Sequence, residues 1–307
     1  MILRYISKRV LYLIPTLLVL SFVVFGLVRL IPGDPVLAIA GPDATPEVLE
    51  EMRTALGLNR PMLTQYGFYL KGLLVGDLGT SLRTHQQVWS EIGRRLSSTL
   101  ELAAAGMALS LIVGIGLGIM AALRPRNWAD ASTRIVSLLG VSSPTFWTGL
   151  LFVLAFGYYW RLFPIAGSGG LRHLVLPAFT VSLTSLAFIT RLTRASLIEV
   201  FSQDYIRTAR AKGASPLRVI VHHALQNALI APLTVAGLEF GRLVSGVIVI
   251  ETIFAWPGIG KLLIEAIQFR DWPVIQGLIL AFALIFAIVN LAVDILYGIL
   301  DPRIRLE

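Results

Sequence analysis

The chain has 307 residues, of which 56% are hydrophobic and 14% charged, and its mean hydropathy is +0.77. A soluble domain carries about 25% charged residues, so this composition argues against a water-soluble protein and indicates membrane spans. The formal net charge of +8 fits basic cytoplasmic loops better than nucleic-acid binding, and the absence of cysteine excludes disulfides and thiolate chemistry.

The first predicted element is a membrane span over residues 10–30. Arg4, Lys8 and Arg9 precede its apolar stretch, as they would in a secretory signal peptide. The stretch is long for a signal core and runs into Ile31-Pro32-Gly33-Asp34-Pro35 without a small-residue cleavage site. We therefore expect this span to be retained.

Five further segments are long and apolar enough to cross about 30 Å of hydrocarbon as helices. Lysine and arginine gather in the short loops on one side, which is the cytoplasmic side by the positive-inside rule. The chain is therefore predicted to be an all-α polytopic membrane protein with six spans and both termini in the cytoplasm. The five segments are residues 98–123, 135–159, 174–195, 229–252 and 274–299.

Residues 31–97 are predicted to form an external helical segment. Thr45-Pro46-Glu47 matches the cap, the first residue and the acidic first turn of a helix that Gly57 ends. A second amphipathic helix is predicted over residues 62–74. The segment is expected either to contact a partner that delivers substrate or to shield the mouth of a pore.

The cytoplasmic loop 203–227, between the fourth and fifth spans, is predicted to fold as helix, break and helix. Gly213 supplies the break. Ser215 matches the cap of the second helix, and Pro216 matches its first residue.

Two kinds of side chain are expected on the surface of this loop. An apolar stripe at helical spacing is formed by Leu217, Ile220, Val221 and Ala224. A cationic surface is formed by Arg207, Arg210 and Arg218. From these residues alone, the loop either seats as a rigid knob in a groove on a soluble partner or lies on anionic membrane lipid.

The loop resembles the EAA loop of bacterial ABC-importer permeases, whose pattern is E-A-A, three residues, G, nine residues and I-x-L-P. In that register the chain has Arg207-Thr208-Ala209, then Gly213, then His223-Ala224-Leu225-Gln226. Arginine replaces the leading glutamate and glutamine the closing proline, which is similar to the dipeptide/oligopeptide branch of the family.

Other stretches that resemble this branch follow in order along nearly the whole chain, so the resemblance is specific. They are Ile31-Pro32-Gly33-Asp34-Pro35, Leu56-Gly57-Leu58, Gly76-Asp77-Leu78-Gly79, Thr99-Leu100-Glu101-Leu102, Glu251-Thr252-Ile253-Phe254-Ala255-Trp256-Pro257-Gly258, Val293-Asp294-Ile295-Leu296-Tyr297-Gly298 and Asp301-Pro302-Arg303. The first stretch and the sizeable external segment resemble the "B"-type permease of the family's pair.

The resemblance implies one transmembrane permease domain over residues 1–307, of the type I ABC importer kind, in the bacterial inner membrane. It implies a sister permease, two cytoplasmic ABC ATPases that use ATP and Mg²⁺, and an external substrate-binding protein. Substrates of the branch are dipeptides, oligopeptides, glutathione and some metal chelates. The ATPase-coupling interface would comprise Arg207, Ala209, Arg210, Lys212, Gly213, Ser215, Pro216, Leu217, Ile220, His223 and Leu225.

No cofactor, catalytic residue or metal site is expected in this chain. Residues 255–262 come nearest to a phosphate-binding loop, but Ala255 and Leu262 stand where that motif needs Gly and Ser or Thr. Gly114-Ile115-Gly116-Leu117-Gly118 lies within a span and predicts close helix packing. His222 and His223 point about 100° apart on a helix, which favours polar contacts over a metal pair.

Charged residues within the spans are further candidates, because such groups usually face a bundle or a cavity. Glu239 and Arg242 are predicted to pair, either as a structural ion pair or as lining of the translocation pathway that meets the charged ends of a peptide. Asp294 is a weaker pathway candidate. The turn Trp256-Pro257-Gly258 is a candidate outer gate.

Two other classes of function are weighed against an ABC permease. A secondary transporter or channel would work alone and usually shows inverted repeats, whereas a membrane enzyme or scaffold would show catalytic or docking motifs. Neither kind of pattern is found in the sequence.

Overall fold

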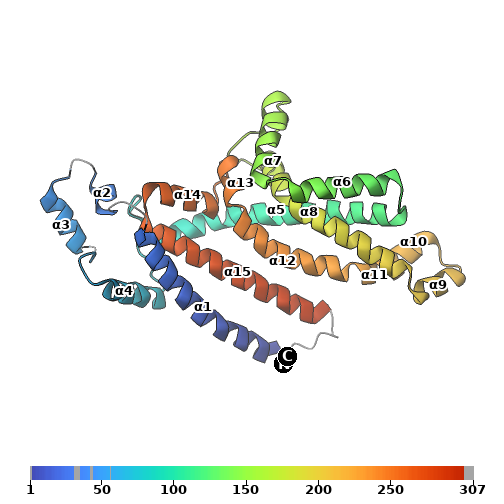
Figure 1. Ribbon diagram of the computed structural model, residues 1–307, viewed down its shortest axis with the longest axis horizontal. Helices are drawn as coiled ribbons and strands as arrows, with labels where there is room; N and C mark the ends of the chain where they lie inside the picture. Colours follow the sequence, from blue (N-terminus) through green and yellow to red (C-terminus); the bar gives the residue numbers. More distant parts are fainter. Residues whose placement is uncertain (1, 31–34, 42–43, 56, 301–307) are drawn as a thin grey trace. The chain divides into compact units, whose positions relative to one another are not determined.

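The computed structural model describes residues 2–30, 35–41, 44–55 and 57–300, and within these ranges most of the chain is helical (Figure 1). It divides into two compact units. The first is Met1–Thr99 with Pro257–Ile288, and the second is Leu100–Trp256 with Val289–Glu307.

The first unit contains the first predicted span, the helices of the predicted external segment and helices from the last part of the chain. They are α1 (Ile2–Leu30), α2 (Pro35–Ala40), α3 (Pro46–Ala55), α4 (Met62–Leu74), the first part of α5 (Val88–Leu123), α14 (Ile259–Phe269) and the first part of α15 (Trp272–Leu300). The two helices predicted within residues 31–97 are confirmed. Helix α3 begins at Pro46 and is followed by Gly57 with φ +66°, and α4 has the predicted bounds.

Helix α4 is fastened to α1 by polar and aromatic contacts. The hydroxyl groups of Tyr66 and Ser21 lie 3.0 Å apart, and Nη2 of Arg29 donates to Oε1 of Gln65 over 2.6 Å. The ring of Phe25 lies 5.3 Å from that of Tyr66. One side of α4 therefore packs on α1, as expected of an amphipathic helix.

A buried carboxylate organises the turn between α14 and α15. Asp271 accepts a hydrogen bond of 2.5 Å from the hydroxyl of Ser81 and one of 3.1 Å from the backbone N–H of Leu82. Both Asp271 and Ser81 are buried. The contact holds the loop before α5 against the start of α15, although 190 positions separate the two residues.

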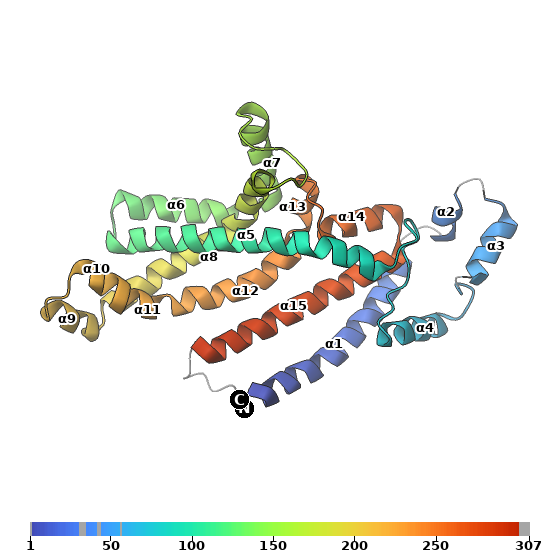
Figure 2. The same ribbon diagram turned by 180° about the vertical axis from the view of Figure 1, so that it is seen from behind.

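The second unit contains the remaining helices. They are the rest of α5, α6 (Trp128–Ser142), α7 (Thr145–Phe152), the π-helix η1 (Val153–Tyr159), α8 (Leu171–Phe201), α9 (Asp204–Ala211), α10 (Pro216–Arg218), the π-helix η2 (Val219–Ala224), α11 (Leu225–Ala228), α12 (Ile230–Gly246), α13 (Ile248–Ile253) and the last part of α15. Helix α8 packs against α6, α7 and α12. Figure 2 shows α9 and α10 grouped beyond the ends of α8 and α11.

The glycines of α5 pack closely against α8, as the sequence predicts. A Cβ atom on Gly114 would lie 3.1 Å from the carbonyl oxygen of Leu186, and one on Gly118 would lie 2.6 Å from Cβ of Thr193. Gly116, on another side of the helix, has nothing within 4 Å of the equivalent point. The close-packing interpretation is thus confirmed for Gly114 and Gly118.

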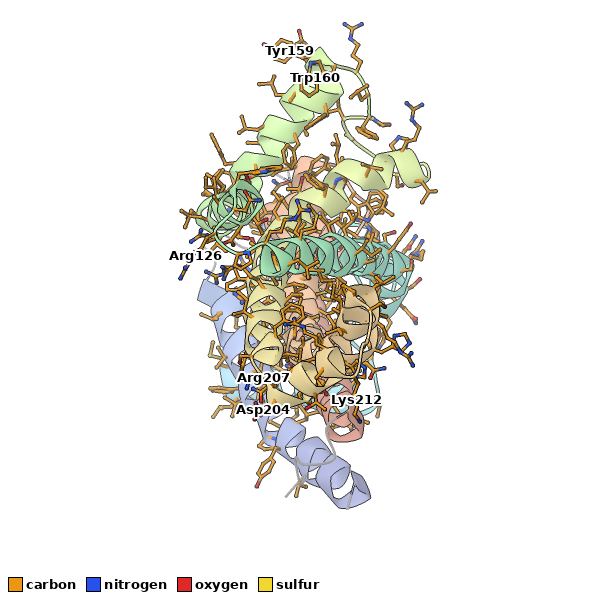
Figure 3. The ribbon with its side chains drawn as sticks, turned by 90° about the vertical axis from the view of Figure 1, so that its right-hand side faces the viewer. Arg126, Tyr159, Trp160, Asp204, Arg207 and Lys212 are labelled. Carbon is orange, nitrogen blue, oxygen red and sulfur yellow. The ribbon has the colours of Figure 1, made fainter. Side chains whose placement is uncertain are left out.

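The predicted third span, residues 135–159, is bent sharply. Helix α6 ends at Ser142, Pro144 caps α7, and the two helical segments meet at 108°. Tyr159 and Trp160 lie at the far end of the second segment (Figure 3). Pro177, by contrast, lies inside an unbroken α8.

Hydropathy and length identify fewer spans than the sequence predicts. Within the described residues, three helices are long and apolar enough to cross a membrane, and up to five if each bent pair is one span. Residues Leu11–Leu27 of α1 form a shorter apolar helix. The all-α membrane fold is confirmed, whereas the count of six spans stays a prediction.

Candidate coupling site

The loop 203–227, called here the coupling segment, folds as helix, break and helix. Helix α9 is followed by Gly213, whose φ of +81° places it in the left-handed region that favours glycine. The hydroxyl of Ser215 accepts a hydrogen bond of 3.4 Å from the backbone N–H of Arg218, and Pro216 is the first residue of α10. The break, the cap and the proline are therefore confirmed.

A buried apolar cluster anchors the coupling segment to the helix ends beneath it. Ile206 from α9 and Val219 and Ala224 from η2 pack with Leu197 of α8 and Ala122 of α5. All five are buried. Because one cluster joins α9, η2, α8 and α5, the segment is held as a firm knob.

The predicted apolar stripe lies only partly on the surface of the segment. Leu217 is 71% exposed and Val221 is also exposed, as a surface for a partner requires, whereas Ala224 is buried in the apolar cluster. Helix α10 has only one turn, and it continues as the π-helix η2. The wider turn of a π-helix changes which positions share a face, so the residues of a stripe placed at the spacing of an α-helix do not all remain on the exposed side.

The outer surface of the coupling segment is cationic. Its exposed basic side chains are Arg207, Arg210, Lys212 and Arg218. Figure 3 shows Asp204, Arg207 and Lys212 near one another at this end of the unit. Asp204 and Arg207 are 3.9 Å apart but almost fully exposed, so their pairing neutralises little of the surface charge.

A shallow cavity of about 380 Å³ opens beside the knob. Phe201, Arg210 and Ile220 are among the residues that line it. The guanidinium carbon of Arg210 lies 6.0 Å from the centre of the Phe201 ring, which is the outer limit of a cation–π contact. The cavity is therefore lined by apolar side chains next to the positive charge of Arg210.

Other residues of the predicted interface lie behind the exposed surface and stabilise the coupling segment. Ala209 and Leu225 are partly buried against the apolar cluster. The side-chain amide of Asn227 donates to the hydroxyl of Tyr205 over 2.9 Å and to the carbonyl of His223 over 3.5 Å. These contacts tie α11 back to α9 and stiffen the segment.

The predicted pair Glu239 and Arg242 is present on α12. Nη1 of Arg242 lies 2.8 Å from Oε1 of Glu239, and the hydroxyl of Ser185 on α8 donates to Oε2 of Glu239 over 3.2 Å. The side chain of Asp294 lies outside the described part of the structure.

The candidate outer gate forms a tight turn between α13 and α14. Trp256 is buried, and its backbone N–H donates to the carbonyl of Glu251 over 2.8 Å. Gly258 is the residue that precedes α14, and Pro257 is half-buried. The role of this turn as a gate stays a prediction.

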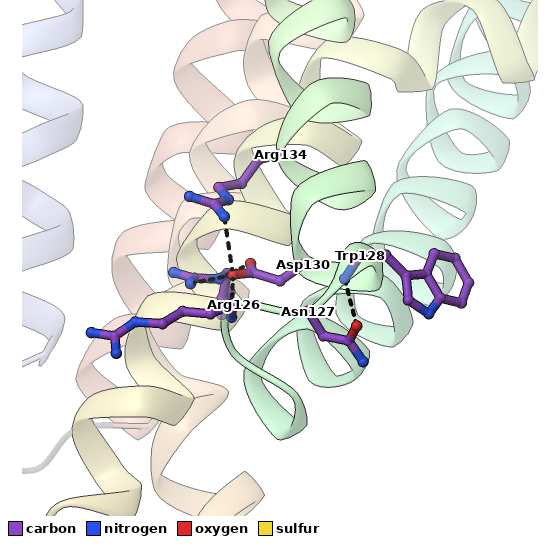
Figure 4. A network of polar contacts seen from close by, with 6 residues as sticks. Arg126, Asn127, Trp128, Asp130 and Arg134 are labelled. Atoms are coloured by element: carbon purple, nitrogen blue, oxygen red, sulfur yellow. Dashed lines mark hydrogen bonds and ion pairs between the residues drawn. The ribbon is translucent and has the colours of Figure 1, made fainter.

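Sequence reasoning missed a polar network around Asp130 (Figure 4). Nε and Nη2 of Arg194 lie 2.6 and 3.0 Å from the two carboxylate oxygens of Asp130, and Arg134 lies 3.4 Å away. The backbone N–H of Arg126 also donates to this carboxylate over 3.0 Å. The sequence did contain a local signal for Asp130. Asn127 is a typical N-cap residue, and Asp130 follows it by three positions, as in a capping box.

The described residues contain no cluster of three or more histidine, aspartate or glutamate side chains that could hold a metal ion.

Two family models together match most of the chain. The model described as "Binding-protein-dependent transport system inner membrane component" matches residues 114–306, and the N-terminal model of the same transport systems matches residues 2–103. The chain belongs to this family. It is a permease subunit of an ABC importer, and members of the family are transport subunits of the inner membrane rather than enzymes.

Relatives of this permease match over their full length. The "Dipeptide transport system permease protein DppB" of Alkalihalophilus pseudofirmus is 42% identical, with 99% of each chain covered. The "Glutathione transport system permease protein GsiC" of Escherichia coli is also 42% identical, again with 99% of each chain covered.

A solved structure shares the fold of this permease. It is described as an amino acid ABC transporter with histidines, and it matches with a TM-score of 0.52 and 15% identity. The match covers 70% of this chain and 94% of the other. At this identity the likeness concerns the fold alone.

Proposed function

We propose that this permease is one of two membrane subunits of an ATP-driven importer for dipeptides, oligopeptides or related solutes such as glutathione. It would form the translocation pathway with a sister permease. Two cytoplasmic ATPases would hydrolyse ATP with Mg²⁺, and an external binding protein would deliver the substrate.

The observation that carries this proposal is the anchored knob of the coupling segment. Its cationic surface is exposed, while Ile206 and Val219 bind it to the ends of α5 and α8 through a buried cluster. A knob built in this way transmits force, since a partner that moves it must also move the helices beneath it. A helix that merely rested on lipid would not need so firm a base.

The printed names of the relatives indicate a class of substrate. One relative is named for dipeptide transport and another for glutathione transport. Both solutes are short peptides with at least one free carboxylate. We infer that this chain conducts solutes of that class, and that the binding protein makes the finer choice among them.

The proposed mechanism is alternating access. ATP binding closes the two ATPases together and draws the coupling segments inward. Helices α8 and α12 then turn the pathway from inward-facing to outward-facing, and hydrolysis resets it. In this arrangement both termini and the coupling segment are cytoplasmic, and residues 31–97 face outward as part of one permease domain.

A charge reversal tests the coupling role. The complex with its sister permease, ATPases and binding protein is reconstituted in proteoliposomes with Arg210→Glu. Peptide-stimulated ATP hydrolysis and peptide uptake are expected to fall about tenfold, which corresponds to roughly 1.4 kcal/mol. The reason is that the cation beside the cavity of the coupling segment becomes an anion.

The matched control is Arg161→Glu, the same reversal on an exposed arginine outside the segment. Its uptake is expected to stay at the wild-type level. Wild-type hydrolysis and uptake in Arg210→Glu would show that the segment does not couple the ATPases to this chain.

A further inference from the structure

Arg242 is an exposed cation on a mostly apolar helix. Glu239 and Arg242 are the only charged residues of α12. Arg242 follows the first residue of the helix, Ile230, by about 18 Å along the axis, and its side chain is 66% exposed. A guanidinium is costly to place in lipid tails, so this face of α12 is expected to meet water or a polar group.

The exposed face continues on either side of Arg242. Leu238 lies one turn before it and Ser245 one turn after it, and both are exposed. Residues three or four apart share a face of a helix. Arg242 thus stands in the middle of an uncovered strip rather than at the edge of a packed one.

Glu239, which is more buried than Arg242, orients the guanidinium group of Arg242 through an ion pair. Its side chain is 11% exposed and lies 2.8 Å from Nη1 of Arg242. The second oxygen of Glu239 accepts from Ser185, which is buried on α8. Both carboxylate oxygens are therefore engaged, and the carboxylate holds the guanidinium by one edge.

The remaining donors of Arg242 suit a planar anion. A guanidinium has five N–H donors, and a carboxylate can take two of them in parallel. Glu239 neutralises part of the positive charge, so an incoming anion is held without becoming trapped. A transport site needs this balance, because its ligand must leave as readily as it enters.

We propose that Arg242 binds the terminal carboxylate of the transported peptide within the pathway, and that Glu239, held by Ser185, is a positioning residue for it. The proposal rests on the proposed function, in which this chain lines the route of short peptides. Beyond that function, it specifies that the peptide carboxylate is the group recognised in the pathway and that Arg242 recognises it.

The absence of cysteine allows a direct test. Ser245→Cys is introduced into the assembled complex, and its reaction with a neutral maleimide is followed by the mass of this chain. Dialanine is expected to slow the reaction several-fold, whereas the same dipeptide with an amidated C-terminus is expected to leave it unchanged. Leu238→Cys provides a second site if Ser245→Cys disturbs assembly.

Variants of the pair separate binding from structure. With Arg242→Gln the half-protecting concentration of dialanine is expected to rise about tenfold, as for the loss of a charge-assisted pair. Arg242→Lys is expected to keep part of the protection. Glu239→Gln removes the competing carboxylate, so dialanine should protect at lower concentration while the turnover number for uptake falls.

Leu171→Cys is the control for labelling, because Leu171 is exposed at the start of α8, away from this strip. Its reaction should respond to neither dipeptide. Equal protection by acid and amide, protection that survives Arg242→Gln, or failure of both cysteines to react would overturn the proposal. Peptide uptake with ATP in the same preparation would show that the proposed function still holds.

Discussion

Three glycines of α5 differ in what surrounds them. Gly114 and Gly118 face α8, and a Cβ atom on Gly118 would lie 2.9 Å from the carbonyl oxygen of Thr190. Backbone atoms cannot move aside as a flexible side chain does. Gly116 faces open space on the same helix.

We expect Gly118→Ala to destabilise the protein by roughly 1–3 kcal/mol, because the added methyl group forces α5 away from α8. Gly116→Ala is the matched control and should be neutral or slightly stabilising, since alanine favours a helix more than glycine does. Melting temperatures of the purified variants in detergent measure the difference. Equal melting temperatures would contradict the packing described for Gly118.

Some single-residue roles follow from the sequence and others do not. Ser215, Pro216 and Gly213 act through neighbours a few positions away, so local capping and turn rules predicted them. Asp130 and Asp271 act through partners 64 and 190 positions distant. Only the folded chain brings those partners together. The sequence around Asn127 marks Asp130 as a residue of a helix start, but it does not indicate Arg194 as its partner.

At the scale of elements, the coupling segment depends on a left-handed backbone conformation at Gly213, which few residues other than glycine adopt easily. Gly213 has φ +81°, and nothing lies within 4 Å of its hypothetical Cβ atom. A substitution there is therefore strained by the backbone alone. The π-helix η2 escaped prediction, because a π-helical turn has no hydrophobic period of its own that separates it from an α-helix.

We expect Gly213→Ala to cost about 1 kcal/mol locally and to lower peptide-stimulated ATP hydrolysis. Gly213→Asn should retain more of the stimulation, because asparagine tolerates a positive φ better than alanine does. Stimulated hydrolysis in proteoliposomes measures the effect, and melting temperatures report global stability. An alanine variant with stimulation equal to that of wild type would contradict a role for this turn.

For the whole molecule, the all-α membrane fold and the family could be predicted from the sequence. Long apolar runs predicted the fold, and an ordered set of stretches from 31–35 to 301–303 predicted the family. The spans were harder to predict, since length and hydropathy cannot reveal a bend of 108°. The division into two units depends on contacts between distant parts of the chain.

We expect this chain to act only within a complex. Purified in mild detergent, it should carry a sister permease and two ATPase chains, identified by mass spectrometry. Reconstituted alone, it should show no peptide uptake, because the energy source lies in other chains. Uptake by the lone chain without ATP would instead indicate a secondary transporter.

The length of α8 has a mechanical consequence. Its 31 residues form one unbroken helix of about 46 Å, and Leu197 near its end is clamped in the buried cluster beneath the coupling segment. A stiff rod pivoting at one end amplifies small rotations. A tilt of about 10° would sweep its opposite tip through about 8 Å, so modest closure of a motor could produce a displacement as wide as a peptide backbone.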